Sequence, residues 1–209
     1  MPVSTPTEVR QVTTPAALAL ADLAGIFEDL QTVLRCCERL MAVLAVPRDA
    51  DELSLEAFWT TAVLSYGRCF DPSERGQLLT ADDVTATGLP GDVAGWHETL
   101  AQVRKHYTEP SLNPREVFSV GVARDDSGAA AGVAVTSTRH PLVDEVSVRQ
   151  TGAIAFELSR IVDTRISEQQ QVVFTGTSSL SGEELDALPL LDLVDLDDPG
   201  PNREPPPAE

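Results

Sequence analysis

A long apolar seam near the start of the chain is the feature that most constrains its fold. Apolar residues recur there at alternating spacings of four and three, and the seam comprises Ala16, Leu20, Leu23, Phe27, Leu30, Leu34, Cys37, Met41 and Leu44. This heptad pattern predicts one long helix, with Thr14 as N-cap, Pro15 in the first turn and Pro47 at its end. A second apolar line widens the stripe through Ala19, Ile26, Val33 and Leu40. We therefore expect the helix to pack in a bundle or to pair with a second copy as a homodimer.

Three further helices follow from apolar spacing and from helix-breaking residues. Helical spacing predicts helices over about 51–70, 92–107 and 144–171. Asp71 and Pro72 end the first of these, and Asp92 supplies an N-cap for the next. Residues 73–91 are predicted to be a short irregular or helical connector.

The pattern changes to that of a β-hairpin over about 116–138. Two apolar runs, 117–122 and 132–138, flank a turn at Asp125–Gly128. Because an isolated hairpin is marginally stable in water, we expect it to lie against the helices. The predicted fold class is thus mainly α: a helical bundle with a long N-terminal helix, a small β-hairpin before the last long helix, and a disordered acidic C-terminal tail.

The two ends of the chain are expected to lie outside the helical domain. Residues 1–13 are predicted to be a flexible leader, residues 14–175 the helical domain, and residues 176–209 a disordered acidic, proline-rich tail. The tail carries nine acidic residues and one arginine. Apolar residues alternate with these carboxylates at Leu188, Leu190, Leu191, Leu193 and Leu196. Two interpretations stay open: a solubilising tail that folds back weakly, or a short helix that docks into a protein partner.

The net charge of the chain disfavours some classes of binding partner. A formal net charge of −18 repels phosphate backbones, which disfavours generic binding to nucleic acid or to an anionic membrane unless a local basic patch overrides it. No apolar run approaches the ~20 residues that span a bilayer. The three cysteines form no disulfide framework. We therefore expect a cytoplasmic protein that does not bind membranes, with RNA a disfavoured partner.

Common catalytic frameworks are absent from the sequence. It contains no GxGxxG, no P-loop lysine, no GxSxG and no HExxH motif. His97 and His106 are nine residues apart, a spacing too wide for two metal ligands on one helical face. We predict neither a metal site nor a cofactor. Arg104, Lys105, His106 and Arg115 form the only local basic cluster.

Two segments nevertheless carry a resemblance to a known family. The run 65–70 reads Ser-Tyr-Gly-Arg-Cys-Phe, and within 97–113 the residues His97, Arg104, Ser111 and Asn113 fall in register with a conserved pattern of that family. Over about 53–123, a third of the chain, the sequence resembles a group of mainly actinobacterial helical proteins related to the HEPN and AbiV-like abortive-infection domains. The resemblance implies a setting in phage defence or in a toxin–antitoxin pair.

In HEPN ribonucleases an arginine is followed four to six residues later by a histidine, usually facing the same pair across a dimer. Here the matching position is Pro110, so the resemblance implies a degenerate motif. Arg104 and His106 lie only two residues apart and point about 200° from each other on an intact helix. Candidate catalytic residues are Arg104, His106 and His97. Candidate binding residues are Arg68, Tyr66, Lys105, Asn113 and Arg115.

Three functions follow, in order of preference. The first is a catalytically silent HEPN-like interaction module. The second is a metal-independent endoribonuclease that uses Arg104 with His106 or His97, in which arginine neutralises the phosphate and imidazole moves a proton. The third is a regulator that acts through its acidic tail.

Overall fold

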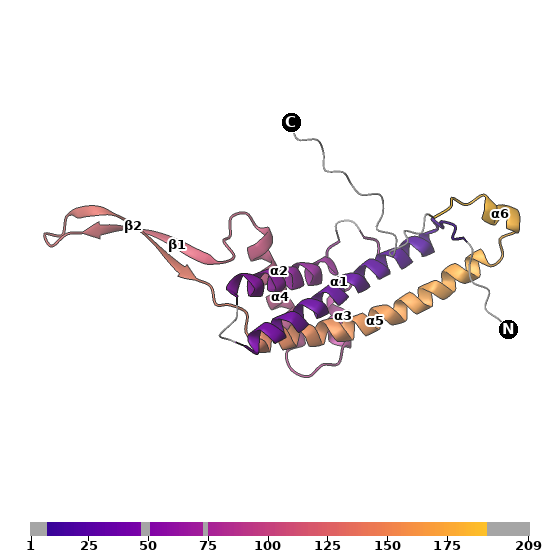
Figure 1. The fold of residues 1–209 in the computed structure, drawn as a ribbon, viewed down its shortest axis with the longest axis horizontal. Coiled ribbons are helices and arrows are strands. Elements are labelled where there is room, and N and C mark those ends of the chain that lie inside the picture. Colours follow the sequence, from indigo (N-terminus) through magenta and orange to yellow (C-terminus); the bar gives the residue numbers. More distant parts are fainter. Residues whose placement is uncertain (1–7, 47–50, 73–74, 192–209) are drawn as a thin grey trace, which may run out of the picture.

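The computed structural model describes residues 8–46, 51–72 and 75–191, and Figure 1 shows their arrangement. This part of the chain is mainly helical and carries one two-stranded antiparallel hairpin before the last long helix, which confirms the predicted fold class. Its elements are α1 (Pro15–Leu44), α2 (Glu52–Arg68), α3 (Ala81–Ala86), α4 (Val93–Thr108), β1 (Glu116–Arg124), β2 (Ala130–Arg139), α5 (Glu145–Thr177) and α6 (Gly182–Asp186).

The body of the molecule is built on α1 and α5, two long helices that run antiparallel (Figure 1). The Thr14 side chain accepts a hydrogen bond from the amide of Ala17, and Pro15 opens α1, as predicted. Fully buried positions of α1 are Ile26, Leu30, Val33 and Leu40. α1 contacts both α5 and α2, which bury Leu23, Leu30 and Cys37 of its heptad seam and leave the other seam residues half-buried. The predicted bundle is thus confirmed, whereas the pairing of α1 with a second copy stays a prediction.

The shorter helices complete one side of the bundle. α2 packs on α1, α4 packs on α2, and α3 contacts α4 and α5. Asp51 and Asp92 cap α2 and α4 through hydrogen bonds from backbone amides, and Thr80 forms a capping box at α3. The Trp96 indole donates to Thr151 Oγ1 of α5 at 3.2 Å. These contacts fix the end of α2 against α4, where most of the predicted site residues lie.

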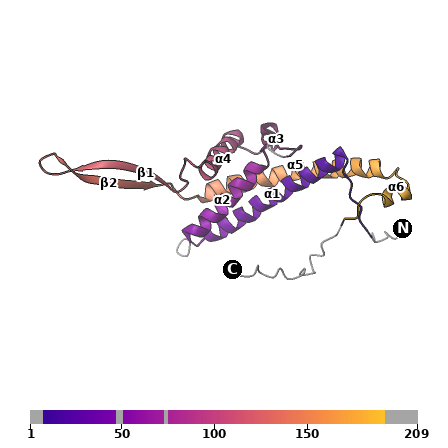
Figure 2. The ribbon, with the colours of Figure 1, turned by 90° about the horizontal axis from the view of Figure 1, so that it is seen from above.

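The hairpin has the predicted turn but not the predicted position. Asp125 Oδ1 accepts from the amides of Ser127 and Ala129, and Gly128 adopts φ +84°. Figures 1 and 2 show the hairpin projecting beyond the end of the bundle, and nearly all of its residues are exposed. The prediction that it lies against the helices is therefore wrong. Alternation along each strand specifies strand pairing, but it does not specify the direction in which the hairpin leaves the bundle.

Two ion pairs hold the base of the hairpin to the first turns of α2. Arg115 Nε lies 2.8 Å from Glu56 Oε1, and Arg139 Nη1 lies 3.3 Å from Glu52 Oε2. The first pair joins the start of β1 to α2, and the second joins the end of β2 to α2. We refer to the projecting hairpin, residues 116–139, as the arm.

The first part of the predicted tail, residues 176–191, departs from the prediction. α5 continues to Thr177, and α6 follows, where the Ser181 side chain and that of Glu184 form a capping box. Residues 8–11 run antiparallel to 189–191, and Arg10 Nη1 donates to the carbonyls of Asp186 and Leu188.

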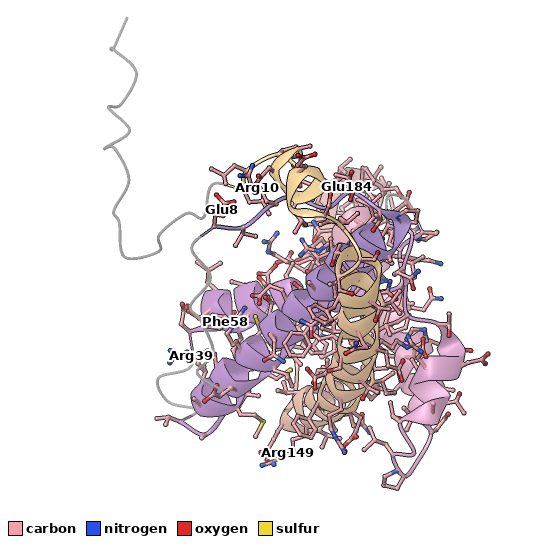
Figure 3. The ribbon with its side chains drawn as sticks, turned by 90° about the vertical axis from the view of Figure 1, so that its right-hand side faces the viewer. Glu8, Arg10, Arg39, Phe58, Arg149 and Glu184 are labelled. Carbon is pink, nitrogen blue, oxygen red and sulfur yellow. The ribbon has the colours of Figure 1, made fainter. Side chains whose placement is uncertain are left out.

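Figure 3 shows Arg10 at the same end of the molecule as Glu184. Residues 8–13 and 176–191 therefore have defined contacts, which a prediction from composition could not detect. Leu188 is half-buried, whereas Leu190 and Leu191 are exposed. Leu193, Leu196 and the rest of 192–209, like residues 1–7, lie outside the described residues.

Candidate functional site

The family-like residues gather where the C-terminal end of α2 meets α4. His97 and Arg104 are seven residues apart on α4, which places them on one face of the helix, two turns from each other. That face meets Tyr66 and Gly67, the two residues that precede Arg68 at the end of α2. The structure thus brings the two resembling segments into direct contact.

A hydrogen bond of 2.9 Å joins Tyr66 Oη to His97 Nδ1. The Phe70 ring lies against both groups, with ring centroids 4.6 Å from His97 and 5.1 Å from Tyr66. Burial raises the pKa of Tyr66 and lowers the pKa of His97, so both groups are neutral at pH 7. A single proton then lies between Oη and Nδ1, and the contact ties α2 to α4.

Arg104 crosses the backbone of α2 at Gly67. A Cβ atom at position 67 would clash with Arg104 Cδ, so a larger residue there would displace the arginine. Beyond Gly67, Arg104 Nη2 reaches Asp71 Oδ2 at 2.5 Å. Gly67 and Asp71 are therefore part of this site, although sequence reasoning did not select them. One sign in the sequence indicated that Arg104 approaches the α2 backbone closely, which is a glycine near the end of a predicted helix.

Arg68 faces the opposite way, toward α1. Its guanidinium pairs with the buried Asp29, and Arg75 Nη2 donates to the other carboxylate oxygen at 3.0 Å. The Asp29 carboxylate, accepting a hydrogen bond from Arg68, raises the pKa of that arginine further. Arg68 thus links α2 to α1 rather than contacting Arg104. Asp29 was hidden from sequence reasoning because it sits within an apolar seam.

His106 lies on another side of α4. The helix continues to Thr108, so it is intact at Arg104 and His106, and the two side chains have different neighbours. The His106 ring lies 5.5 Å from that of His140, centroid to centroid. The pairing of Arg104 with His106 that a ribonuclease would use is therefore not formed.

The remaining binding candidates have local roles or none. Lys105 is exposed. The Asn113 side chain accepts hydrogen bonds from the amides of Arg115 and Glu116, which shapes the loop that enters β1. Arg115 is the residue that anchors the arm to Glu56.

A groove of about 940 Å³ opens at the base of the arm. It lies between α2, α4, the strand ends and the start of α5, and its lining includes His106 and Arg115 but neither His97 nor Arg104. The apolar part of this lining includes Leu53, Leu55, Trp59, Trp96, Val103, Leu142 and Val143. We refer to this groove as the base groove.

Within the described ranges, no cluster of side chains is suited to bind a metal ion, and Cys37 and Cys69 are not activated as nucleophiles. No group of three or more His, Cys, Asp or Glu side chains gathers there in a way that could hold a metal ion. Burial raises the pKa of Cys37 and of Cys69 to about 12, which leaves both thiols protonated and poorly nucleophilic. Across the same ranges no helix combines the length and apolar character needed to cross a bilayer.

Comparison of the chain with protein-family models, with curated proteins and with solved structures finds no match. The class of protein that the fold defines is a helical bundle with a projecting β-hairpin arm.

The contact between Tyr66 and His97 predicts a pH-dependent stability. The pKa of His97 is about 6.5 in the unfolded chain and lower in the folded chain. The unfolded chain therefore binds more protons below pH 6.5, and the free energy of unfolding decreases as the pH falls below that value. We expect the free energy of unfolding, measured by urea denaturation, to fall more between pH 7.5 and 5.5 for the wild type than for His97→Gln. Equal losses in both proteins would contradict the half-buried, neutral imidazole.

Proposed function

We propose that the chain is a catalytically silent helical interaction module, and that the arm is its contact element. The observation that carries this proposal is the engagement of Arg104 by Asp71 and of His97 by Tyr66. The family resemblance supports a setting in phage defence or in a toxin–antitoxin pair.

A ribonuclease needs a guanidinium that can meet the scissile phosphate and an imidazole within reach of the same atoms. A phosphate at Arg104 would have to compete with the Asp71 carboxylate at 2.5 Å, in a chain of formal charge −18. His106 faces the base groove instead. These contacts favour a structural role for Arg104 over phosphate binding.

The arm supports the second half of the proposal. It projects from the body with nearly all of its residues exposed, and a two-stranded hairpin on its own is marginally stable in water. An extended apolar surface on an exposed element is typical of a protein contact site.

The proposal is tested by incubating the full chain with labelled single-stranded RNA and transfer RNA. We expect no cleavage by the wild type, and we expect Arg104→Ala to lower stability by about 1–3 kcal/mol through loss of a charged hydrogen bond. Arg149→Ala, which removes an exposed pair with Glu145, serves as the matched control. Cleavage by the wild type that Arg104→Ala abolishes would establish the ribonuclease in place of the silent module.

A further inference from the structure

The base groove has both buried aromatic residues and exposed aliphatic residues in its lining. Both tryptophans of the chain line it: Trp59 on α2 is buried, and Trp96 on α4 is half-buried. Leu53 and Leu142 line it as well, with exposed fractions of 68% and 50%. Small-molecule sites have volumes of about 300–1,000 Å³, a range that includes the 940 Å³ of this groove. The groove therefore has the size and the apolar surface of a small-molecule site.

Carboxylates outnumber cations in the lining of the groove. Among the described residues that line it, the acidic ones are Asp51, Glu52, Glu56, Glu116 and Asp144, and the arginines are Arg115 and Arg139. The two histidines of the groove are neutral in this formal count. Asp51 and Asp144 cap α2 and α5, and each helix N-terminus offsets its aspartate by about half a charge. An excess of about two negative charges remains in the groove.

Part of this excess lies where two carboxylates share Arg139. Arg139 Nη1 lies 3.3 Å from Glu52 Oε2, and Arg139 Nε lies 3.6 Å from Glu116 Oε1. Both distances exceed the roughly 2.7–2.9 Å of a charge-assisted hydrogen bond, so the guanidinium holds neither carboxylate tightly. The Glu52 side chain is also 67% exposed. A cation from solution can therefore approach Glu52 and Glu116 and neutralise the second negative charge.

One side of α2 places this negative charge beside aromatic rings. Glu52, Glu56 and Trp59 are four and three residues apart, a spacing that puts them on the same side of the helix. Burial, and then the neighbouring charge of Glu56, raise the pKa of Tyr107, which also lines the groove. A cation near these carboxylates is therefore also close to aromatic rings, which attract cations through their faces.

We propose that the base groove binds a small organic cation, a molecule with one ammonium group and an apolar body. The ammonium group lies at Glu52 and Glu116, and the apolar body lies on Leu53 and Trp59. Charge selects this class of ligand, because the excess carboxylates repel an anion and give a neutral molecule no electrostatic gain. The lining contains neither His97 nor Arg104, so this site goes beyond the proposed function and does not depend on it.

Three probes of similar shape and different charge test the proposal on the full chain. Adamantylammonium, adamantanol and adamantanecarboxylate share one rigid apolar cage that does not absorb where tryptophan does. Because both tryptophans of the chain line the groove, intrinsic fluorescence reports its occupancy. We expect saturable binding of adamantylammonium with a dissociation constant below about 1 mM, as suits a probe of this size. Adamantanol should bind at least threefold more weakly, and adamantanecarboxylate at least tenfold more weakly.

Two matched pairs of variants locate the site. Glu52→Gln should weaken the binding of adamantylammonium about two- to fivefold and leave that of adamantanol unchanged. Glu28→Gln is its control and should bind like the wild type, because Glu28 is similarly exposed and also pairs with an arginine, but lies outside the groove lining. Leu53→Lys should weaken the binding of adamantylammonium at least tenfold. Leu18→Lys, at another exposed leucine outside the lining, should not weaken it.

Four results would each overturn the proposal. The first two are seen in the wild type: no saturable fluorescence change up to about 10 mM adamantylammonium, or equal affinity for adamantylammonium and adamantanol. The others are wild-type affinity in Leu53→Lys and a loss in Glu28→Gln as large as that in Glu52→Gln. Circular dichroism verifies that each variant is folded, and the comparison of the three probes on the wild type requires no substitution.

Discussion

Asp29→Ala is expected to lower the free energy of unfolding by about 3 kcal/mol. The carboxylate is buried and accepts hydrogen bonds from Arg68 and Arg75, so its removal leaves two guanidinium groups without their shared anion. We place the effect at the low end of the usual range for broken buried pairs, because Arg68 keeps 62% of its side chain exposed. Urea denaturation at fixed protein concentration measures the change.

The neighbouring residue provides the control for this prediction. Glu28 pairs with Arg35 on the exposed side of α1, and both side chains are more than half exposed. Glu28→Ala should therefore cost no more than about 1 kcal/mol. Equal losses for Asp29→Ala and Glu28→Ala would show that the buried pair does not join α1 to the end of α2.

Leu30→Ala should destabilise the bundle by about 3–5 kcal/mol. Leu30 is fully buried at the centre of α1, and truncating it removes apolar contacts and leaves a cavity that a packed core only partly fills. Thermal and urea denaturation both report the loss.

Leu18 is the matched control on the same helix. It has an exposed fraction of 58%, so Leu18→Ala should change the free energy of unfolding by less than about 0.5 kcal/mol. If the two substitutions cost the same, the heptad seam would not be the core of the single chain.

Local chemistry made most of the fold predictable. Thr14 and Pro15 set the start of α1, because a threonine side chain and a residue without an amide proton suit the first turn. Gly128 set the turn of the arm, since a positive φ favours glycine. Such signals act over a few residues, and a sequence displays them directly.

Long-range placement could not be predicted in the same way. The α1 seam has the same spacing whether it meets α2 and α5 or a second copy, so periodicity left both arrangements open. The direction of the arm depends on Arg115 and Arg139 meeting α2, which involves residues 59 and 87 positions apart. Arg10 orders residues 186–190 by a contact across nearly the whole chain.

The candidate site was predicted in part. The resemblance selected Tyr66, His97 and Arg104, and the structure brings them together at one helix contact. It could not show that Asp71 engages Arg104, because an aspartate just after the end of a helix is common and does not by itself indicate a partner. Nor could it show that His106 faces away, since that depends on α4 continuing to Thr108.

The pairing of residues 8–11 with 189–191 has a practical consequence for handling the molecule. Both strands of this pairing lie beside α6, at the end of the body opposite the arm (Figures 1 and 2). A surface tether attached beside Val9 or beside Leu191 would therefore hold the molecule by the same end. In either orientation the arm and the base groove would point into solution, where they remain accessible to a binding partner.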